Sequence, residues 1–434
     1  MTAPKRAVIL SGGGANGAYE VGALKAQCSG QSPATRIDLQ NPDEKPQILD
    51  PDIFAGTSVG AFNAAYLVSK WRSYREIAVP GTVALADLEK VWLEQLCHNP
   101  DGSGNGVYKF LANPLDLLDP RRYLPNPVHP LAQWVRESLA LTRDLTYRAL
   151  SFLSLGDEPL IERLLPLVNV DNFISREPFR KILSEVMQYE AIRSSDKTLK
   201  VAATSWETGR VKGFANHDFT DDRGPLIILA SSAIPGFFAA QTIGAQPFVD
   251  GSVLMNTPLD LCKDESDRLP DVLHIIYLDP DVGAIPIQHL SNLLSVQYRV
   301  QVITWAERVN RSIERVSTVN EAIELRKPLE QKMPEQAQAL SKVTSLLIDN
   351  PEEAKELTIH RYHPHDPLGG ALGMLDFRRD RIEALIDRGF TDAISHDCDR
   401  SQCVIPGRPR KVPDECRALL RFMELAADTR GGVA

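Results

Sequence analysis

A candidate nucleophile, Ser58, lies in a G-x-S-x-G pattern at residues 56–60. The pattern falls between a predicted strand at 53–55 and a predicted helix at 59–68. A tight strand-to-helix turn lifts a serine hydroxyl into a cleft, and flanking glycines relieve the crowding there. The start of the helix also favours negative charge that develops near the serine. The alternative is a plain turn in which Ser58 caps the helix.

A glycine-rich segment at residues 12–17 follows a predicted strand at 6–10 and precedes a predicted helix at 17–27. Consecutive glycines can present backbone N–H groups to an oxyanion without obstruction. The segment also satisfies G-x-G-x-x-G, a dinucleotide-binding fingerprint, and Asp38 follows at the distance of a ribose-binding acid. However, residues 36–39 make a poor second strand. A glycine-rich turn without a ligand is the third interpretation.

A serine nucleophile requires a base, and Asp250 is one candidate. It ends an apolar strand at 248–250 and begins an Asp-Gly turn, although that dipeptide is common in turns without function. Histidine is the usual base. The histidine cluster at positions 360, 363 and 365, with Asp366, could bind a metal or complete a triad. Its setting favours exposed loop histidines instead.

The six cysteines are sparse and irregularly spaced, which favours free thiols in a reducing compartment over a disulfide framework. Three possible metal ligands, His396, Cys398 and Cys403, lie close together in sequence. A structural zinc site needs four convergent ligands, so we predict no metal here.

Composition excludes several classes of protein. The chain has 434 residues, of which 43% are hydrophobic and 24% charged, and its formal net charge is −9. These values are typical of a globular protein. They exclude a disordered chain, a collagen-like repeat and a basic nucleic-acid binder, so we expect no nucleic-acid partner.

The segment between positions 225 and 249 is the longest stretch without charge. Three prolines and two glycines interrupt it, which favours a buried core over a membrane span. No targeting segment is visible before the glycines at position 12. We therefore expect a soluble, cytoplasmic protein with at most peripheral contact with membranes.

Strands alternate with helices along the chain, which predicts an α/β fold with a mainly parallel sheet. Short helices joined by loops are expected over 107–170. The remaining predicted strands lie at 198–205, 211–214, 226–229, 272–278 and 358–362, and the remaining predicted helices at 85–96, 288–347, 376–395 and 408–433.

Three motifs together resemble the patatin-like phospholipase family: the glycines at 12–14, the serine turn at Ser58 and the aspartate turn at Asp250, in that order. The blocks at 202–209, 231–238 and 256–259 are similar to the family's sequence around these motifs. The resemblance implies a three-layer α/β/α fold with helical additions. It also implies a patatin-like domain over 1–396, a helical insertion at about 81–195, and a C-terminal extension over 397–434.

The resemblance implies a lipid acyl hydrolase of the phospholipase A type, acting without a cofactor on a phospholipid or another acyl lipid. Ser58 would attack the ester, and Asp250 would accept its proton and later activate water. The N–H groups of Gly12, Gly13 and Gly14 would form the oxyanion hole. Supporting turn positions would be Gly17, Gly56, Gly60 and Gly251. A nucleotide-binding oxidoreductase that uses the loop from Gly12 to Gly17, or a catalytically idle lipid-binding member, are the alternatives.

Two positions depart from the family pattern. Asn16 stands where the family often has arginine or lysine, which removes a positive charge near the expected oxyanion hole. Ser252 stands where glycine or alanine is frequent. The leucine-rich segment at 111–167 suggests either a cap that binds acyl chains or ordinary core packing.

Overall fold

A computed structural model describes residues 4–39, 41, 43–71, 79–97, 105–110, 174–264, 268–282, 293–332 and 355–408. The strands are β1 (Arg6–Leu10), β2 (Ile53–Thr57), β3 (Lys109–Phe110), β4 (Ile174–Ser175), β5 (Thr198–Ser205), β6 (Val211–Ala215), β7 (Gln241–Ile243), β8 (Gln246–Asp250), β9 (Val272–Ile276) and β10 (Thr358–Tyr362). The α-helices are α1 (Ala18–Cys28), α2 (Val59–Trp71), α3 (Pro80–Val91), α6 (Glu177–Val186), α7 (Tyr189–Arg193), α8 (Gly224–Ser231), α9 (Leu293–Lys332), α11 (Gly370–Gly373) and α12 (Arg379–Ile394).

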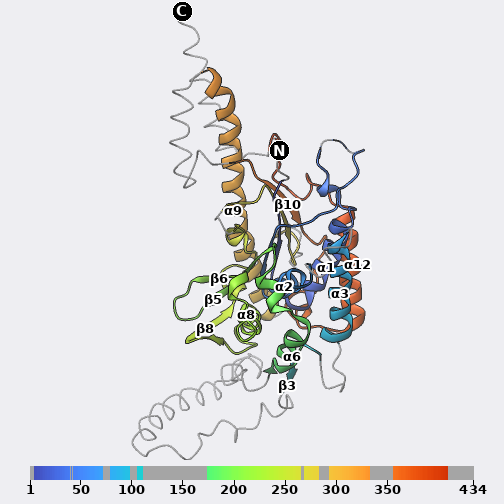
Figure 1. The fold of residues 1–434 in the computed structure, drawn as a ribbon, viewed down its shortest axis with the longest axis vertical. Coiled ribbons are helices and arrows are strands. Elements are labelled where there is room, and N and C mark those ends of the chain that lie inside the picture. The colour runs from blue at the N-terminus through green and yellow to red at the C-terminus, as the bar shows by residue number, and fades with distance from the viewer. Residues whose placement is uncertain are drawn as a thin grey trace, which may run out of the picture.

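The main sheet has the strand order β10-β9-β1-β2-β5-β8-β7, and an eighth strand, β6, also pairs with β5. Strands β10, β9, β1, β2 and β5 run parallel to one another. The pairs β5–β6, β5–β8 and β7–β8 are antiparallel. Helices cover both faces, and Figure 1 shows α9 on the side of the sheet opposite α1, α3 and α12. The expected mainly parallel α/β/α architecture is confirmed.

The two faces of the sheet divide the core according to the alternation of side chains along a strand. In β1, Val8 and Leu10 face the larger core cluster, which holds the buried residues of α1, α2 and α12. Ala7 and Ile9 face the smaller cluster, to which Ile313 of α9 belongs. Burial on both faces explains why this strand is a continuous apolar run in the sequence.

Helices from the two ends of the described chain pack tightly, since α1 lies against α12 (Figure 1). A Cβ at Gly22 of α1 would lie 1.9 Å from the carbonyl oxygen of Ile386, and one at Gly389 of α12 would lie 2.0 Å from that of Tyr19. Both helices therefore need glycine where their backbones meet. Beyond α12 the chain returns to the sheet, because Val404 pairs with Ile359 of β10. The expected domain bounds and the insertion stay predictions.

The strand expected at 226–229 is wrong, because this segment lies within helix α8. A short apolar run does not distinguish a buried strand from a buried helix. Pro225 stands in the first turn of α8, where its missing N–H costs nothing. The predicted helix at 85–96 is α3 followed by a π-helical turn at Trp92–Leu96. The terminal helix at 408–433 and most of the short helices expected over 107–170 lie outside the described residues.

The long charge-free segment folds into α8, β7 and β8. Within the parts of the chain that the structure describes, no helix combines the length and apolar character needed to cross a bilayer.

Candidate active site

Strand register brings the serine turn and the aspartate turn to the same level of the sheet. Thr57, the last residue of β2, pairs with Ala202 of β5, and the next residue of β5, Ala203, pairs with Asp250. Ser58 follows Thr57 directly. The glycine loop leaves β1, whose last residue, Leu10, pairs with Gly56. The three motifs follow β1, β2 and β8, so they meet at the same end of the four adjacent strands β1, β2, β5 and β8.

Ser58 adopts a strained backbone at the turn from β2 into α2. Its φ of 56° lies in the left-handed region, which is uncommon for a residue other than glycine and is typical of a nucleophile elbow. The Ser58 N–H donates to the Ser231 hydroxyl at 2.8 Å, and that hydroxyl donates to the Ala202 carbonyl at 2.7 Å. Ser58, the first residue after β2, is thus held to β5 through the Ser231 side chain at the end of α8.

Asp250 is fully buried at the end of β8. Its Oδ1 accepts the Ser252 N–H at 2.8 Å. Its Oδ2 is buried without a partner of good hydrogen-bond geometry among the described residues. Burial raises the pKa of Asp250 to about 6, against the lowering effects of the Ser252 amide and hydroxyl, the Ser58 hydroxyl and the Arg176 charge. The Ser58 hydroxyl therefore lies close enough to affect this carboxylate, whose free oxygen can take up a proton.

The glycine loop runs beside the serine, since a Cβ at Gly12 would lie 3.2 Å from the Ser58 Cβ. The loop differs from expectation at Gly12, whose N–H already donates to the Asn256 carbonyl at 3.1 Å. The N–H groups of Gly13 and Gly14 donate to no residue that the structure describes. Gly14 has a φ of 57°, and a Cβ there would lie 2.3 Å from the Met374 carbonyl oxygen. Of the three amides expected to form an oxyanion hole, that of Gly12 therefore has an acceptor in the protein, whereas those of Gly13 and Gly14 have none among the described residues.

The other glycines of the motifs allow close approach of neighbouring groups. A Cβ at these positions would lie 2.4 Å from Val59 Cγ2 (Gly17), 2.2 Å from the Gly60 oxygen (Gly56), 2.4 Å from the Leu10 oxygen (Gly60) and 2.5 Å from the Ala202 oxygen (Gly251). Glycine at these positions therefore lets the glycine loop approach Val59, the start of α2 approach β1, and the aspartate turn approach β5.

An apolar pocket lies beside Ser58 and opens to solvent, and the space between its walls, open solvent included, is about 530 Å³. Apart from Ser58, Arg176 and Ser232, its walls are backbone and apolar side chains. The apolar side chains include Val59, Phe62, Trp92, Leu96, Val107, Phe179, Ile234, Phe238 and Phe377. A pocket with this lining suits an acyl chain whose ester carbonyl lies at the serine.

Arg176, which follows β4, supplies a positive charge to this pocket, and sequence reasoning missed it. Its guanidinium donates to the carbonyls of Leu229 at 2.6 Å and Ala239 at 3.2 Å, and it lies over the Phe238 ring at 5.0 Å. Burial lowers the pKa of Arg176 to about 10, whereas the charge of Asp250 raises it. No motif in the sequence marks this arginine, because it reaches the site only through tertiary packing.

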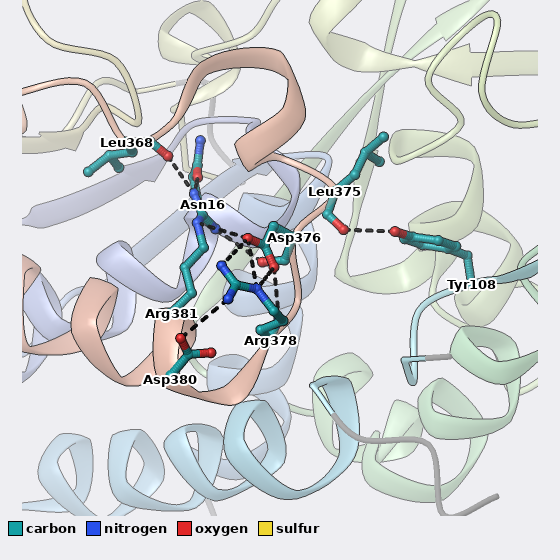
Figure 2. A network of polar contacts seen from close by, with 8 residues as sticks. All are labelled: Asn16, Tyr108, Leu368, Leu375, Asp376, Arg378, Asp380 and Arg381. Atoms are coloured by element: carbon teal, nitrogen blue, oxygen red, sulfur yellow. Dashed lines mark hydrogen bonds and ion pairs between the residues drawn. The ribbon is translucent and has the colours of Figure 1, made fainter. Parts of the chain in front are cut away.

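The positive charge missing at Asn16 is replaced from α12. Arg381 Nη2 donates to Asn16 Oδ1 at 2.7 Å and also to the Leu368 carbonyl (Figure 2). Figure 2 shows Arg381 beside Asp376, whose Oδ2 lies 3.8 Å from Arg381 Nε. The guanidinium therefore joins the glycine loop to the segment that carries Met374. Sequence analysis found the loss of charge but not its substitute, which is 365 positions away.

Helix α9 fixes the aspartate turn from the other side. The Trp305 indole N–H donates to the Ser252 carbonyl at 2.6 Å, and Arg308 donates to the Leu254 carbonyl at the same distance. Ser252 therefore contributes its backbone to the turn at both ends, because its own N–H is bound to Asp250.

The three histidines expected in an exposed loop differ in how far they are exposed. His360 is buried in β10, His363 is half-buried, and His365 is exposed. None of the three lines the described wall of the Ser58 pocket. Instead, the ligand atoms of His360, His396, Cys398 and Cys403 converge within 4.8 Å of one another. His360 is thus the fourth candidate ligand that the sequence around His396, Cys398 and Cys403 lacks, so the expectation of no metal loses its basis.

Asp38 does not lie where a dinucleotide-binding fold needs its acidic residue. It is exposed in a loop, its N–H donates to Glu44 at 2.6 Å, and the strand that follows β1 begins only at Ile53. The geometry therefore gives no support to the oxidoreductase alternative.

Comparisons with known proteins identify one family. The family model described as patatin-like phospholipase matches residues 8–263, more than half of the chain. A search of solved structures finds the crystal structure of VipD from Legionella pneumophila, with 14% sequence identity, covering 88% of this chain and 67% of that one. The TM-score of 0.28 is too low for this likeness to carry an argument. A search of curated proteins finds no match.

Proposed function

The chain belongs to the patatin-like phospholipase family, and from this premise we propose that it hydrolyses fatty acyl esters of lipids through Ser58 and Asp250. Membership supports a lipid hydrolase at the level of the family. The observation that carries the finer proposal is the buried carboxylate of Asp250, whose Oδ2 lacks a partner among the described residues and whose pKa is lowered by the Ser58 hydroxyl. A phospholipid or another acyl lipid is the proposed substrate.

In the first step, Ser58 Oγ attacks the ester carbonyl carbon while its proton passes to Asp250 Oδ2. The carbonyl oxygen becomes an oxyanion, which the N–H groups of Gly13 and Gly14 stabilise. When the C–O bond breaks, the leaving alcohol takes the proton from Asp250 and the acyl group stays on Ser58. Water then gives a proton to Asp250 and attacks the acyl carbon. When the bond from the acyl carbon to Ser58 Oγ breaks, Asp250 returns the proton to Ser58 Oγ, which releases the fatty acid and restores both side chains.

A carboxylate is a weaker base than histidine, and the surroundings of Asp250 reduce this disadvantage. Burial raises its pKa to about 6, so that it holds a proton more readily than a carboxylate in water. The half-buried Arg176 guanidinium stabilises negative charge in the same apolar pocket. The two free amides would do much of the remaining work, because loss of one such donor typically costs about 100- to 1,000-fold in rate.

Fluorophosphonate labelling followed by mapping of the modified peptide tests this proposal, because the reagent reacts with activated serines. We expect labelling at Ser58, and its loss in Ser58→Ala and Asp250→Asn. Ser184→Ala is the matched control, since Ser184 is an exposed serine on α6. Labelling at another serine, or undiminished ester hydrolysis by purified Ser58→Ala, would disprove the assignment.

Contact with membranes belongs to the same proposal, because the substrate is part of a lipid surface. A net charge of −9 gives no attraction to anionic lipids, so contact would be mainly hydrophobic. The cap hypothesis concerns residues 111–167, which lie outside the described residues. Sedimentation with liposomes tests it: Phe152→Ser with Leu153→Ser is expected to reduce binding, and unchanged binding by the folded variant would exclude the cap.

A further inference from the structure

Four side chains that sequence separates by up to 43 positions converge beside the edge strand of the sheet. His360 lies on β10, His396 directly follows α12, and Cys398 and Cys403 lie on the loop that comes next. One ligand atom from each lies within 4.8 Å of the other three. Both imidazoles are buried, and both cysteines are free thiols.

The distances between these atoms match a tetrahedral metal site. Cys398 Sγ lies 3.6 Å from His360 Nδ1 and 3.6 Å from His396 Nε2, and Cys403 Sγ lies 3.4 Å from the same His396 nitrogen. In a tetrahedral zinc site, Zn–S distances of about 2.3 Å and Zn–N distances of about 2.0–2.1 Å separate sulfur from nitrogen by roughly 3.5 Å. The cluster therefore needs little rearrangement to hold an ion at its centre.

Neighbouring groups hold three of the four ligand side chains in place. The Arg361 N–H donates to Cys403 Sγ at 3.3 Å, which stabilises a thiolate. The His274 ring stacks on His360 with centroids 5.0 Å apart, and the Tyr362 ring packs on His396 at 4.4 Å. Two thiolates would neutralise a divalent cation, so that the occupied cluster carries no net charge into a largely buried setting.

We propose that His360, His396, Cys398 and Cys403 bind one Zn²⁺ ion in a structural site. Two thiolates and two imidazoles in tetrahedral arrangement favour zinc over magnesium, calcium or manganese, which prefer oxygen ligands. Four protein ligands close the coordination sphere and leave no position for a substrate. The site is therefore independent of the proposed lipid hydrolysis.

The ion would hold the end of the described chain to the sheet. β10 is an edge strand of the sheet. In the described part of the chain, the loop with the two cysteines pairs with β10 through a single backbone bridge, between Val404 and Ile359. A cross-link from this loop to His360 would secure the strand and the end of α12 together. Release of the ion is expected to loosen both, because metal binding to the folded state adds directly to its stability.

Metal analysis of the full chain, purified under reducing conditions from zinc-supplemented medium, tests the proposal. We expect one zinc per chain in the wild type and less than a tenth of that in Cys398→Ser with Cys403→Ser. Cys97→Ser is the matched control and is expected to keep its zinc, because Cys97 lies away from the cluster, with its thiol bonded to the Leu93 carbonyl. Substitution by Co²⁺ adds a spectroscopic readout, since a thiolate-to-cobalt charge-transfer band should appear only where both cysteines are present.

A second measurement guards against variants that fail to fold. Removal of zinc from the wild type with a chelator is expected to lower Tm, and addition of Zn²⁺ should restore it, whereas Mg²⁺ should not. The proposal would be overturned if the wild type bound no zinc under reducing conditions. It would also be overturned if Cys398 and Cys403 formed a disulfide there and bound no zinc. Equal zinc in the wild type and in the double cysteine variant would also overturn it.

Discussion

Arg381 donates a hydrogen bond from α12 to Asn16 at 2.7 Å, so that the glycine loop receives a guanidinium at the position where its own sequence lacks a basic residue. The same guanidinium donates to the Leu368 carbonyl. Its position next to the loop makes it a positioning residue for the amides of Gly13 and Gly14. The contact joins the first glycine motif to a helix that lies outside the matched residues 8–263.

Arg381→Ala is expected to reduce both activity and stability. Hydrogen bonds to a charged donor contribute about 1.5–3 kcal/mol, and we expect a loss of free energy of unfolding in this range. We expect kcat to fall about tenfold, which is less than the roughly 100-fold cost of a 1 Å misplacement at a reacting centre. Arg379→Ala is the control, since Arg379 is exposed and pairs with Glu383. Equal kcat and unfolding midpoints for the two variants would show that the contact with Asn16 is unimportant.

Asp250→Asn is expected to abolish ester hydrolysis and yet stabilise the protein at pH 8. The folded-state pKa of Asp250 is about 6 against an ordinary 3.8. The charged carboxylate therefore opposes folding, and this cost grows as pH rises from about 4 to 6 and is complete above that. Its upper bound is about 3 kcal/mol, from 1.36 kcal/mol per pKa unit.

Urea unfolding at two pH values measures this effect. The advantage of Asp250→Asn over the wild type should be largest at pH 8 and should shrink towards pH 5. The exposed Asp222→Asn is the control and should show little change at either pH. An Asp250→Asn variant that is less stable than the wild type at pH 8 would contradict the assigned cost of burial.

The pH dependence of hydrolysis should report the same carboxyl group. Only the deprotonated form of Asp250 can accept the Ser58 proton, so kcat/KM should be constant above pH 7 and fall below an apparent pKa of about 6. In the acid limb, kcat/KM should fall about tenfold per pH unit. Initial rates with a soluble ester substrate measure this profile. An acid limb centred near pH 4 would mean that the working base is an ordinary exposed carboxylate.

Blocking the apolar pocket should affect long acyl chains and spare short ones. Val107 lines the pocket and is partly buried, so Val107→Trp would fill space that an acyl chain requires. We expect hydrolysis of a long-chain ester to fall at least roughly tenfold, while hydrolysis of an acetate ester stays near the wild-type rate. Ile37→Trp is the control, because Ile37 is 75% exposed. Equal losses for both esters would place the acyl chain elsewhere.

Sequence reasoning predicted the strands of the sheet well, because apolar runs bounded by glycine or polar turns mark buried parallel strands. The bounds of β1, β5 and β10 are confirmed as predicted. The strand expected at 226–229 lies in the helix α8, since a helix with seven of its eight residues buried carries no periodic signal that separates the two structures. This error matters for the site, because Ser231 at the end of α8 accepts the hydrogen bond of the Ser58 N–H.

The elements of the site that sequence reasoning missed all depend on long-range packing. Arg176 and Arg381 lie outside every glycine motif, and only the folded chain brings them to the pocket and the loop. The amide of Gly12 is occupied by Asn256, 244 positions later, which no local pattern indicates. His360 reaches the two cysteines because β10 and the loop after α12 pair, so the fourth ligand could not be found from spacing alone.

The strand order has a consequence for biosynthesis on the ribosome. β1 emerges first, yet its partner β9 and the helix α12 that covers α1 are translated more than 260 and 350 residues later. At about 5–20 residues per second, the nascent polypeptide carries an unpaired flank of β1 for tens of seconds. The sheet around the three motifs therefore cannot be completed before β9 is synthesised, and a product that terminates before β9 would expose an apolar surface to chaperones and proteases.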